Sequence, residues 1–474
     1  MMNKIYITTA IPYVNGNPHI GHAMDYCLAD CYARYQRAKG NEIRFQVGTD
    51  EHGNKIAQKA KDLSISVDKY VEENSNKFKD FITKLNISYT DFIRTTDLEH
   101  EKRAQEIWRR LSDHIYKAKY EGWYCTGCER YITKKEYDEN NGVCPDHQKP
   151  YEKLEEENYY LRISDFKDRI RDAILTNEME ILPDFRKKEI LKLLEESPDV
   201  SISRPISQLS WGVPVPDDSS QVMYVWLDAL SNYITVLGFP DTLDFKEWWP
   251  ADAQFVGKDI LRFHAIIWPA MLIGLGLPLP KTLVSHGMVL CDGQKMSKSI
   301  GNVIDPIEVL GKYGLDAFRY YFLRHVDTFA DSDFTWEKYD DAYNNELAND
   351  LGNLVQRLAT LAEKNHILLD ERDKAGLSDE YCGLMDKFEF SKAFDYVWDK
   401  IQNLNKRIDE EKPWSLAKNG EIEKLERCMK SLINSLVDAV YELMPFLPNA
   451  SEKIIDVFSG EIHPPKTPLF PKER

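Results

Sequence analysis

The 474-residue sequence lacks several features that define whole classes of protein. It has no apolar run near the roughly 20 residues that a membrane-spanning helix needs, so we expect no association with a membrane. It opens on a strand-like pattern and lacks the charged and apolar regions of a signal peptide. Internal repeats and a low-complexity tail are also missing. These absences favour a globular, cytoplasmic protein.

An excess of positive charge is missing as well. The 61 Lys and Arg residues stand against 78 Asp and Glu, a formal net charge of −17, which excludes a protein that coats DNA through general basicity. Local basic patches remain able to bind nucleic acid, because salt screens charges over about 10 Å. Cysteine is scarce, with eight residues, which excludes a disulfide scaffold. Three of these cysteines have metal-ligand spacing, which suits a reducing compartment.

What is present is a globular composition and an α/β pattern. Hydrophobic residues make up 43% and charged residues 29%, and the length predicts two to four domains. Residues 4–10 read as a buried strand and 42–47 as a second one, with a helix from Pro18 to about Lys39 between them. We expect Asn17 to cap this helix and Gly40 to end it. Such a strand–helix–strand unit predicts a parallel sheet.

The pattern changes twice along the chain. It breaks after about residue 114 in a stretch that holds paired cysteines, an acidic run and several prolines, which we interpret as an insertion. Strands return at 254–256 and 282–286, with a helix from Ile260 to about Ile273 between them, and long amphipathic helices fill the rest, broken at Pro413 and Pro445. The predicted segments are two halves of a parallel-sheet domain (1–114 and 226–335), the insertion (115–225) and a helical domain (336–474).

The first group of residues that points to chemistry is Pro18-His19-Ile20-Gly21-His22. His19 and His22 are three residues apart and share one face of the helix start. The free backbone N–H groups there attract phosphate, and Gly21 leaves room for a base or ribose against the backbone. Two imidazoles could then donate hydrogen bonds to a triphosphate. Taken alone, the motif is equally compatible with two histidines that bind nothing.

The second group is Lys295-Met296-Ser297-Lys298-Ser299, just after a hairpin-turn pattern at Asp292-Gly293. Two lysines on a loop beyond the sheet could close over an anionic leaving group and stabilise its charge. Taken alone, the match also fits a solvated lysine turn.

The third group consists of two knuckle-like pairs, Cys125 with Cys128 and Cys144 with His147. Each pair has a two-residue spacer, and three thiolates with one imidazole suit tetrahedral Zn²⁺. Four protein ligands leave no open coordination position, so we expect one structural zinc.

The histidine and lysine motifs stand in order, in the two halves of one α/β pattern. Together they resemble the two motifs of the class I aminoacyl-tRNA synthetases. The surrounding residues are more specifically similar to the methionyl-tRNA synthetases, in segments 8–16, 48–53, 224–229 and 257–260. The similarity extends over essentially the whole chain.

This resemblance implies a Rossmann-like parallel-sheet catalytic domain with a zinc-knuckle insertion, followed by an all-α helix-bundle domain that binds the anticodon. It implies a methionine–tRNA ligase, which forms methionyl-adenylate and pyrophosphate from methionine and ATP and then charges the 3′ adenosine of tRNA(Met) for translation initiation and elongation. Mg²⁺ would accompany the ATP. The implied catalytic residues are His19, His22, Lys295 and Lys298, and Gly21, Gly257 and Asp259 would bind ATP beside the histidines and Lys298.

The resemblance also implies a pocket for methionine, in which Asp50 holds the ammonium group. A polarizable thioether among aromatic rings is physically reasonable. Leu230 departs from relatives that have proline there, and we expect a modest change in pocket shape with the same substrate. The pocket residues would be Ala10, Ile11, Tyr13, Asp50, Trp226, Ala229, Leu230, Tyr233 and His264.

In the helical part, the positions that match the family's anticodon-binding residues are Asn353, Arg357 and Trp414. Asn353 and Arg357 are four residues apart and point the same way on a helix. Their amide and guanidinium groups can read base edges, and an indole after Pro413 can stack on a base. Without the resemblance these are ordinary surface polar residues and a buried tryptophan.

The residues alone leave three alternative functions: a synthetase for another amino acid, a small nucleotidyltransferase and an inactive tRNA-binding protein. Synthetases for leucine, isoleucine and valine carry an editing insertion larger than the roughly 110 residues available here, and the cysteine enzyme has its zinc in the active site. Small nucleotidyltransferases share a helix-start histidine pair but lack a long helical domain. An inactive tRNA-binding protein would not need both motifs intact. We expect a monomer, because the sequence ends soon after the helical part without an appended dimerising domain.

Overall fold

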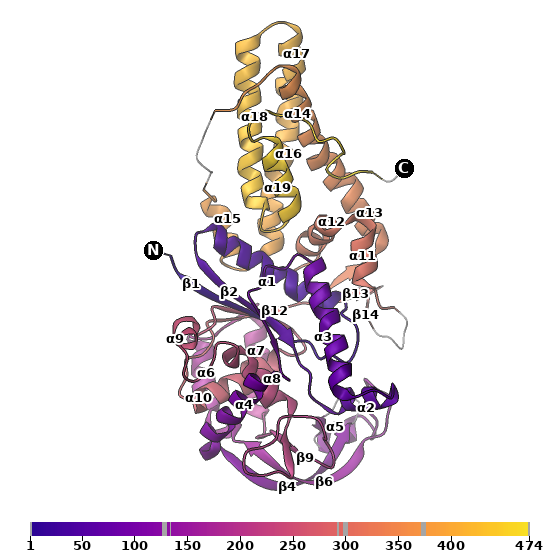
Figure 1. The fold of residues 1–474 in the computed structure, drawn as a ribbon, viewed down its shortest axis with the longest axis vertical. Coiled ribbons are helices and arrows are strands. Elements are labelled where there is room, and N and C mark those ends of the chain that lie inside the picture. The colour runs from indigo at the N-terminus through magenta and orange to yellow at the C-terminus, as the bar shows by residue number, and fades with distance from the viewer. Residues whose placement is uncertain are drawn as a thin grey trace.

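The computed structural model describes residues 2–125, 130–132, 134–291, 293–296, 302–370 and 376–472. The molecule is elongated, with the C-terminal helices at one end, a parallel sheet in the middle and the antiparallel strands of the insertion at the other end (Figure 1). Within the described ranges no helix combines the length and apolarity needed to cross a membrane. The predicted fold class, an α/β domain followed by a helical one, is confirmed.

The central sheet has six strands, all parallel to their neighbours. In sheet order they are β3 (Asp91–Arg94), β2 (Glu42–Thr49), β1 (Lys4–Thr9), β11 (Ala253–Gly257), β12 (Thr282–His286) and β7 (Glu180–Leu182). The strand order reverses between β1 and β11, which come from opposite halves of the chain. Ligands of open α/β sheets bind at such a switch point, beyond the carboxyl ends of the strands.

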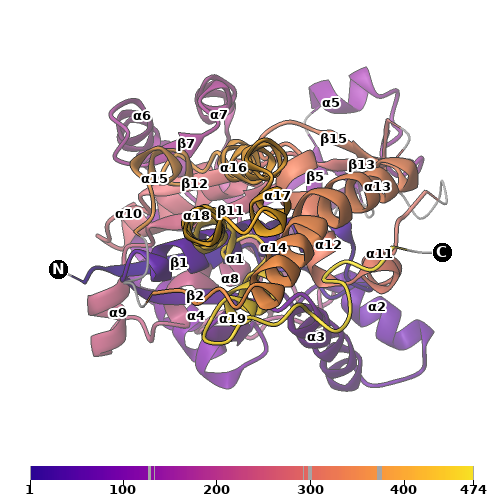
Figure 2. The same ribbon diagram turned by 90° about the horizontal axis from the view of Figure 1, so that it is seen from above.

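Neighbouring residues of β1 belong to different cores, because side chains alternate across a strand. Ile7 packs with Phe45, Val284 and the C-terminal helices, whereas Tyr6 packs with Val256 and helices of the opposite face. Figure 2 shows the helices α14, α16 and α18 over the sheet strands when the molecule is seen from above. The sheet is therefore covered on both faces, as a parallel sheet requires.

The first crossover helix, α1 (Ile20–Ala38), is almost wholly buried between the sheet and the C-terminal helices. Asn17 does not cap it, so that prediction was wrong: His19 is the N-cap, and its Nδ1 accepts a hydrogen bond from the Gly21 N–H. His22 Nδ1 accepts from the His19 N–H in return, which completes a reciprocal capping box. Asparagine is a more common N-cap than histidine, which is why the sequence favoured Asn17. Here two imidazole nitrogens accept hydrogen bonds from the backbone N–H groups at the start of the helix instead.

The remaining helices of the first half lie around the carboxyl ends of β2 and β3. They are α2 (Asn54–Asp62), α3 (Val67–Lys84) and α4 (Leu98–Arg110), followed by a short 3₁₀ turn at Ser112–His114.

The segment 115–225 forms an antiparallel sheet of its own, with the order β5-β4-β6-β8. It also supplies the edge strand β7 of the central sheet, so it is not purely an insertion. Its elements are β4 (Ile115–Cys125), β5 (Arg130–Ile132), α5 (Lys134–Glu139), β6 (Glu152–Leu161), a 3₁₀ turn (Ile163–Asp165), α6 (Lys167–Leu175), α7 (Phe185–Glu196), β8 (Val200–Ser201), and the antiparallel pair β9 (Ser203–Pro205) and β10 (Gln221–Met223).

The second half of the sheet domain carries α8, the helix that follows the insertion. The helix predicted from Ile260 to Ile273 is present from Leu261 onward, and residues Phe263–Ile267 within it are π-helical. A hairpin of β13 and β14 forms at the predicted position. The elements are α8 (Val225–Thr235), α9 (Leu243–Trp248), a π-helix (Phe263–Ile267), α10 (Trp268–Gly274), β13 (Val289–Cys291), β14 (Gln294–Lys295), α11 (Pro306–Tyr313), α12 (Leu315–Tyr320), a second π-helix (Tyr321–His325) and β15 (Ser332–Phe334).

From Trp336 onward all described regular secondary structure is helical, as predicted. Both predicted breaks are present, since Pro413 begins α17 and Pro445 lies between α18 and α19. The elements are α13 (Trp336–Asp341), a π-helix (Ala342–Gly352), α14 (Asn353–Lys364), α15 (Asp379–Met385), α16 (Phe390–Glu411), α17 (Pro413–Lys418), α18 (Ile422–Leu443) and α19 (Pro448–Val457).

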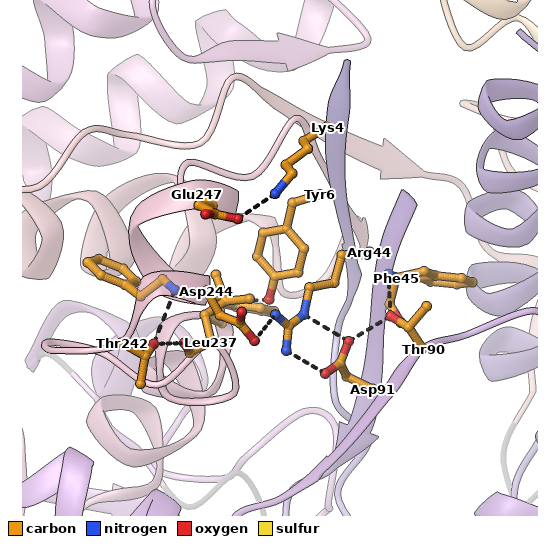
Figure 3. A network of polar contacts seen from close by, with 12 residues as sticks. Lys4, Tyr6, Arg44, Phe45, Thr90, Asp91, Leu237, Thr242, Asp244 and Glu247 are labelled. Carbon is orange, nitrogen blue, oxygen red and sulfur yellow. Dashed lines mark hydrogen bonds and ion pairs between the residues drawn. The ribbon is translucent and has the colours of Figure 1, made fainter. Parts of the chain in front are cut away.

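A polar network ties the first strands of the sheet to α9 (Figure 3). Arg44 on β2 forms ion pairs with Asp91 on β3 and Asp244 on α9, with N–O distances of 2.8 Å for both. Lys4 pairs with Glu247 on the same helix. The Tyr6 hydroxyl donates a 2.9 Å hydrogen bond to the Tyr233 carbonyl. This last contact fixes α8 over the sheet and so positions residues of the site described next.

Candidate active site

A cleft of about 1100 Å³ opens at the switch point of the sheet. Its walls come from the segment after β1, the start of α1, the end of β2, helix α8 and the ends of β11 and β12. The structure brings together here the predicted nucleotide and methionine positions apart from the lysines: Ala10, Ile11, Tyr13, His19, Gly21, His22, Asp50, Trp226, Ala229, Leu230, Tyr233, Gly257, Asp259 and His264.

The two motif histidines stack on each other at the N-terminus of α1. Their ring centroids are 3.6 Å apart and the rings are inclined by 21°. Because each Nδ1 accepts a backbone N–H, the proton of each neutral ring lies on Nε2, which is then a donor. Burial and the neighbouring His19 lower the pKa of His22 well below its usual value, so His22 is a neutral donor at pH 7. Neutral N–H donors at a helix N-terminus suit the oxygens of a phosphate chain.

One wall of the cleft is apolar and aromatic. Trp226 on α8 stacks on Phe263, with ring centroids 3.5 Å apart. The Tyr233 hydroxyl lies 2.7 Å from His264 Nε2, and His264 Nδ1 lies 3.1 Å from the Ile260 carbonyl. That carbonyl needs a donor, so His264 carries its proton on Nδ1 and Nε2 accepts from the tyrosine. Burial lowers the pKa of His264 to about 4, which keeps the imidazole neutral. The wall therefore suits an uncharged side chain.

Asp50, the residue directly after β2, brings a carboxylate to the same cleft. It is 8% exposed and lines the cleft. Its backbone N–H donates to the Pro12 carbonyl at 2.9 Å, and its own carbonyl accepts from the Val14 N–H at 3.0 Å. These two bonds join the segments that follow β1 and β2, so the carboxylate is held at a defined place in the cleft.

On the nucleotide side, Gly257 ends β11 with Asp259 two residues later. A Cβ at Gly257 would lie 2.8 Å from the Asp259 carboxylate, so only glycine leaves this approach open. The lining residues that were not predicted include an ion-paired couple, Asp25 on α1 and His286 at the end of β12, whose side chains are 3.4 Å apart. Burial raises the pKa of Asp25. Burial by itself would lower the pKa of His286, but the Asp25 carboxylate acts against burial and the pKa of His286 is raised. Two features of the sequence could have indicated this pair. Asp25 is an acidic residue at an apolar position of α1, and His286 is a histidine at the end of a strand.

Only part of the lysine motif falls in the described chain. Lys295 belongs to β14, and Met296 lines the cleft. Lys298 lies outside the described residues. The hairpin of β13 and β14 therefore brings Met296 to the cleft that holds the histidines.

Three of the four predicted metal ligands lie close together in the insertion. The ligand atoms of Cys125, Cys144 and His147 all lie within 4.8 Å of one another, and the two cysteines are buried. Cys144 Sγ is 3.5 Å from His147 Nδ1. Cys128 lies outside the described residues. Two thiols and an imidazole at this separation fit the N and S donor set that Zn²⁺ prefers.

The predicted anticodon residues lie on α14 and α17, and α17 is at the tip of the bundle farthest from the sheet (Figure 1). The structure brings two of them together, because the Arg357 guanidinium lies 5.6 Å from the centroid of the Trp414 ring. Arg357 also pairs with Asp409 at 2.6 Å. Trp414 is 40% exposed, so it is not a core residue. Asn353 is exposed, with its amide 3.4 Å from Asn349.

The switch-point cleft with a histidine pair at the first crossover helix is the arrangement of a class I tRNA synthetase, and residues 5–359 match the profile of a family described as tRNA synthetases class I (M). Among curated proteins, methionine–tRNA ligase of Thermotoga maritima is 39% identical over 98% of this chain and 77% of its own. Methionine–tRNA ligase of Clostridium acetobutylicum is 42% identical over 95% of this chain and 72% of its own. The chain belongs to the methionine–tRNA ligase family.

The solved structures agree with this assignment. Methionyl-tRNA synthetase of Mycobacterium tuberculosis in complex with methionyl-adenylate superposes with a TM-score of 0.92, at 35% identity over 99% of this chain and 100% of the other. Its apo form superposes with a TM-score of 0.85, at 32% identity over 100% of this chain and 99% of the other. The predicted family and enzyme class, a tRNA ligase, are confirmed.

Proposed function

We propose that this chain activates L-methionine with ATP and transfers it to the 3′ adenosine of tRNA(Met), with both steps in the cleft at the switch point. The observation that carries the proposal is the placement of the two histidine Nε2 donors and the Asp50 carboxylate in one cleft with the apolar wall of α8. A phosphate chain and an amino acid have complementary sites there within a single cavity.

In the first step, a carboxylate oxygen of methionine attacks the α-phosphorus of ATP, and pyrophosphate leaves. Asp50 would pair with the ammonium group and so aim the carboxylate. His19 and His22 would donate hydrogen bonds to the phosphate oxygens, while Lys298, assisted by Lys295, would meet the charge that develops on the leaving pyrophosphate. Mg²⁺ bound to ATP would neutralise part of the phosphate charge. Gly21, Gly257 and Asp259 would hold the adenosine.

In the second step, a ribose hydroxyl of the terminal adenosine attacks the carbonyl carbon of the adenylate, and AMP leaves. The apolar wall selects the amino acid. A neutral His264 held by Tyr233 presents no charge to a thioether, and Trp226 offers a polarizable surface. Ala10, Ile11, Tyr13, Ala229 and Leu230 would complete the pocket.

We propose that Cys125, Cys128, Cys144 and His147 hold one zinc ion, which would cross-link the end of the insertion. The support is the close approach of three of these residues in the described part of the chain. The cluster lies on the antiparallel sheet of the insertion, so the residues of the cleft perform the chemistry without it. A thiol-rich site of this kind suits the reducing cytoplasm, where we place the protein.

We propose that Trp414, Arg357 and Asn353 bind the anticodon of the tRNA. An exposed indole beside a guanidinium offers a stacking surface with a hydrogen-bond donor at its edge. The cleft residues and these three positions all come from one chain, so a monomer is sufficient for the reaction.

The proposal is tested by ATP–pyrophosphate exchange with each of the twenty amino acids. We expect exchange with methionine to exceed that with leucine, isoleucine, valine and cysteine by orders of magnitude. Exchange that is fastest with another amino acid would contradict the substrate, and its absence with all of them at intact folding would contradict the activity.

A further inference from the structure

A buried chain of polar side chains lies directly behind the methionine pocket. His52 Nδ1 is 2.7 Å from one oxygen of Asp228, and His100 Nε2 is 2.8 Å from the other. His100 Nδ1 is in turn 2.8 Å from the Thr235 hydroxyl. The residues His52, His100 and Asp228 are each at most 2% exposed. The chain connects three elements, the segment after β2, helix α8 and helix α4, and none of these groups has a part in the reaction proposed above.

This network holds the segment that carries Asp50. Side chains alternate in an extended segment, so Asp50 and His52 face one side and Glu51 the other. Glu51 forms ion-paired hydrogen bonds of 2.8 and 3.0 Å to Arg94 on β3, whereas His52 binds Asp228 on α8. The two residues that follow Asp50 are therefore held from opposite sides, Glu51 by Arg94 on β3 and His52 by Asp228 on α8.

The next residue, Gly53, is also closely packed against its neighbours. Gly53 has φ +122°, and a Cβ there would come within 2.3 Å of the Tyr13 hydroxyl, so only glycine fits. Its N–H donates to the Trp211 carbonyl at 3.1 Å, and the Trp211 ring lies 5.5 Å from that of His52. The end of β2 has no room to shift independently of the pocket.

Two members of this chain carry opposite charges. Burial lowers the pKa of His52, but the surrounding carboxylates, Asp228 first among them, together raise it to about 10. The Asp50 carboxylate acts in the same direction, and Glu101 lies 3.6 Å from the other ring nitrogen. For Asp228, burial raises the pKa, but His52 and His100 lower it to about 2. At neutral pH the His52 imidazolium is thus paired with the Asp228 carboxylate.

We propose that Asp228 is a positioning residue for the recognition of the methionine ammonium group, because through His52 it holds Asp50 at a fixed place relative to α8. This inference rests on the proposed role of Asp50. Trp226, Ala229 and Leu230, on the same helix as Asp228, form the apolar wall. The His52–Asp228 contact therefore fixes the polar end of the pocket relative to its apolar end. A shift of either end by a fraction of an ångström weakens the binding of the ammonium group.

The experiment compares two ligands that differ only in the ammonium group, L-methionine methyl ester and methyl 4-(methylthio)butanoate, as inhibitors of ATP–pyrophosphate exchange. Asp228→Asn keeps the shape of the side chain and removes its charge. We expect it to weaken the amino ester at least tenfold, because His52 loses its charged hydrogen-bond partner and Asp50 is no longer held against α8. Inhibition by the ester without the ammonium, and the KM for ATP, should stay within twofold. Equal losses for both esters would overturn the proposal.

Asp50→Asn, measured in parallel, separates this inference from the function it rests on. If Asp50→Asn discriminates between the esters and Asp228→Asn does not, the ammonium role of Asp50 stands and the inference is overturned. If neither variant discriminates, the role assigned to Asp50 is wrong and the inference falls with it. Discrimination by both supports the two together.

Two further variants control for folding. Asp30→Asn removes another fully buried carboxylate, on α1 and remote from the methionine wall, and should lower stability while leaving the ester comparison at the wild-type ratio. His52→Gln keeps a donor towards Asp228 and loses the positive charge. If Asp228→Asn does not fold, His52→Gln decides the question: a selective loss for the amino ester supports the proposal, and a loss shared by both esters overturns it.

Discussion

The guanidinium of Arg319 lies 2.7 Å from the carboxylate of Asp30, and neither side chain has any exposed surface. Arg319 also donates to the carbonyls of Phe446 and Pro445, at 2.7 and 2.9 Å. Asp30 belongs to the helix that begins at the motif histidines, and the two carbonyls belong to the turn between α18 and α19. Arg319, on α12, therefore joins the catalytic helix to the helical domain, through the ion pair on one side and the two carbonyls on the other.

Removal of one member of this pair should destabilise the protein strongly. Arg319→Met leaves Asp30 buried with Arg34 and Ser88 as its remaining partners, and removing one member of a buried ion pair costs about 3–5 kcal/mol. Urea unfolding measures the effect, and the double variant with Asp30→Leu should regain much of it. Lys312→Ala, which breaks the half-exposed pair with Asp340, is the control and should cost under about 1 kcal/mol. Similar small losses for Arg319→Met and Lys312→Ala would contradict the account.

The His52–Asp228 pair predicts a pH dependence of stability. The pKa of His52 rises from an ordinary value of 6.5 to about 10, so its stabilisation is complete below pH 6.5 and is lost as the pH rises through about 10. The pKa of Asp228 falls from 3.8 to about 2, so its contribution is lost as the pH falls through about 2. The difference in free energy of unfolding between wild type and Asp228→Asn should therefore shrink from pH 7 to pH 10. A constant difference over that range would show that His52 is neutral.

Metal analysis of purified protein should find one zinc per chain. Cys144→Ser should lower this content and make the insertion around 115–161 sensitive to protease before the central sheet unfolds, because the ligands lie only in the insertion. Cys428→Ser, on α18 and half-buried, is the matched control and should retain the metal. Protein purified in reducing buffer with almost no zinc and full activity would rule out the site.

Trp414→Ala should weaken aminoacylation strongly and leave pyrophosphate exchange without tRNA almost unchanged. The loss of one base stack corresponds to about 1–3 kcal/mol, or roughly ten- to a hundredfold in tRNA affinity. Because Trp414 is 40% exposed, the melting temperature should stay near that of wild type. Trp398→Ala, which empties a fully buried site in the same domain, should instead lower stability by about 3–5 kcal/mol. Equal losses in both reactions for Trp414→Ala would indicate a structural role.

The sequence predicts those parts of the fold and site in which nearby residues make the pattern. The strand–helix–strand start follows from apolar spacing within 45 residues, and the histidine motif and the cysteine pairs are short segments. The strand β7 was not predicted, because three residues within an irregular stretch carry no periodicity. The Asp25–His286 pair and the His52–Asp228–His100 chain were not predicted either, because their members lie far apart in the chain and only the folded sheet brings them together.

The central claim is that the cleft joins the methionine carboxylate to the α-phosphorus of ATP before the tRNA is charged. The most direct measurement uses methionine labelled with ¹⁸O in both carboxylate oxygens and follows the label by mass spectrometry during aminoacylation of tRNA(Met). If a carboxylate oxygen attacks the α-phosphorus and the bond from that oxygen to the carbonyl carbon then breaks, the AMP released carries one ¹⁸O and the pyrophosphate carries none. Label in the pyrophosphate, or unlabelled AMP with charged tRNA, would contradict the account.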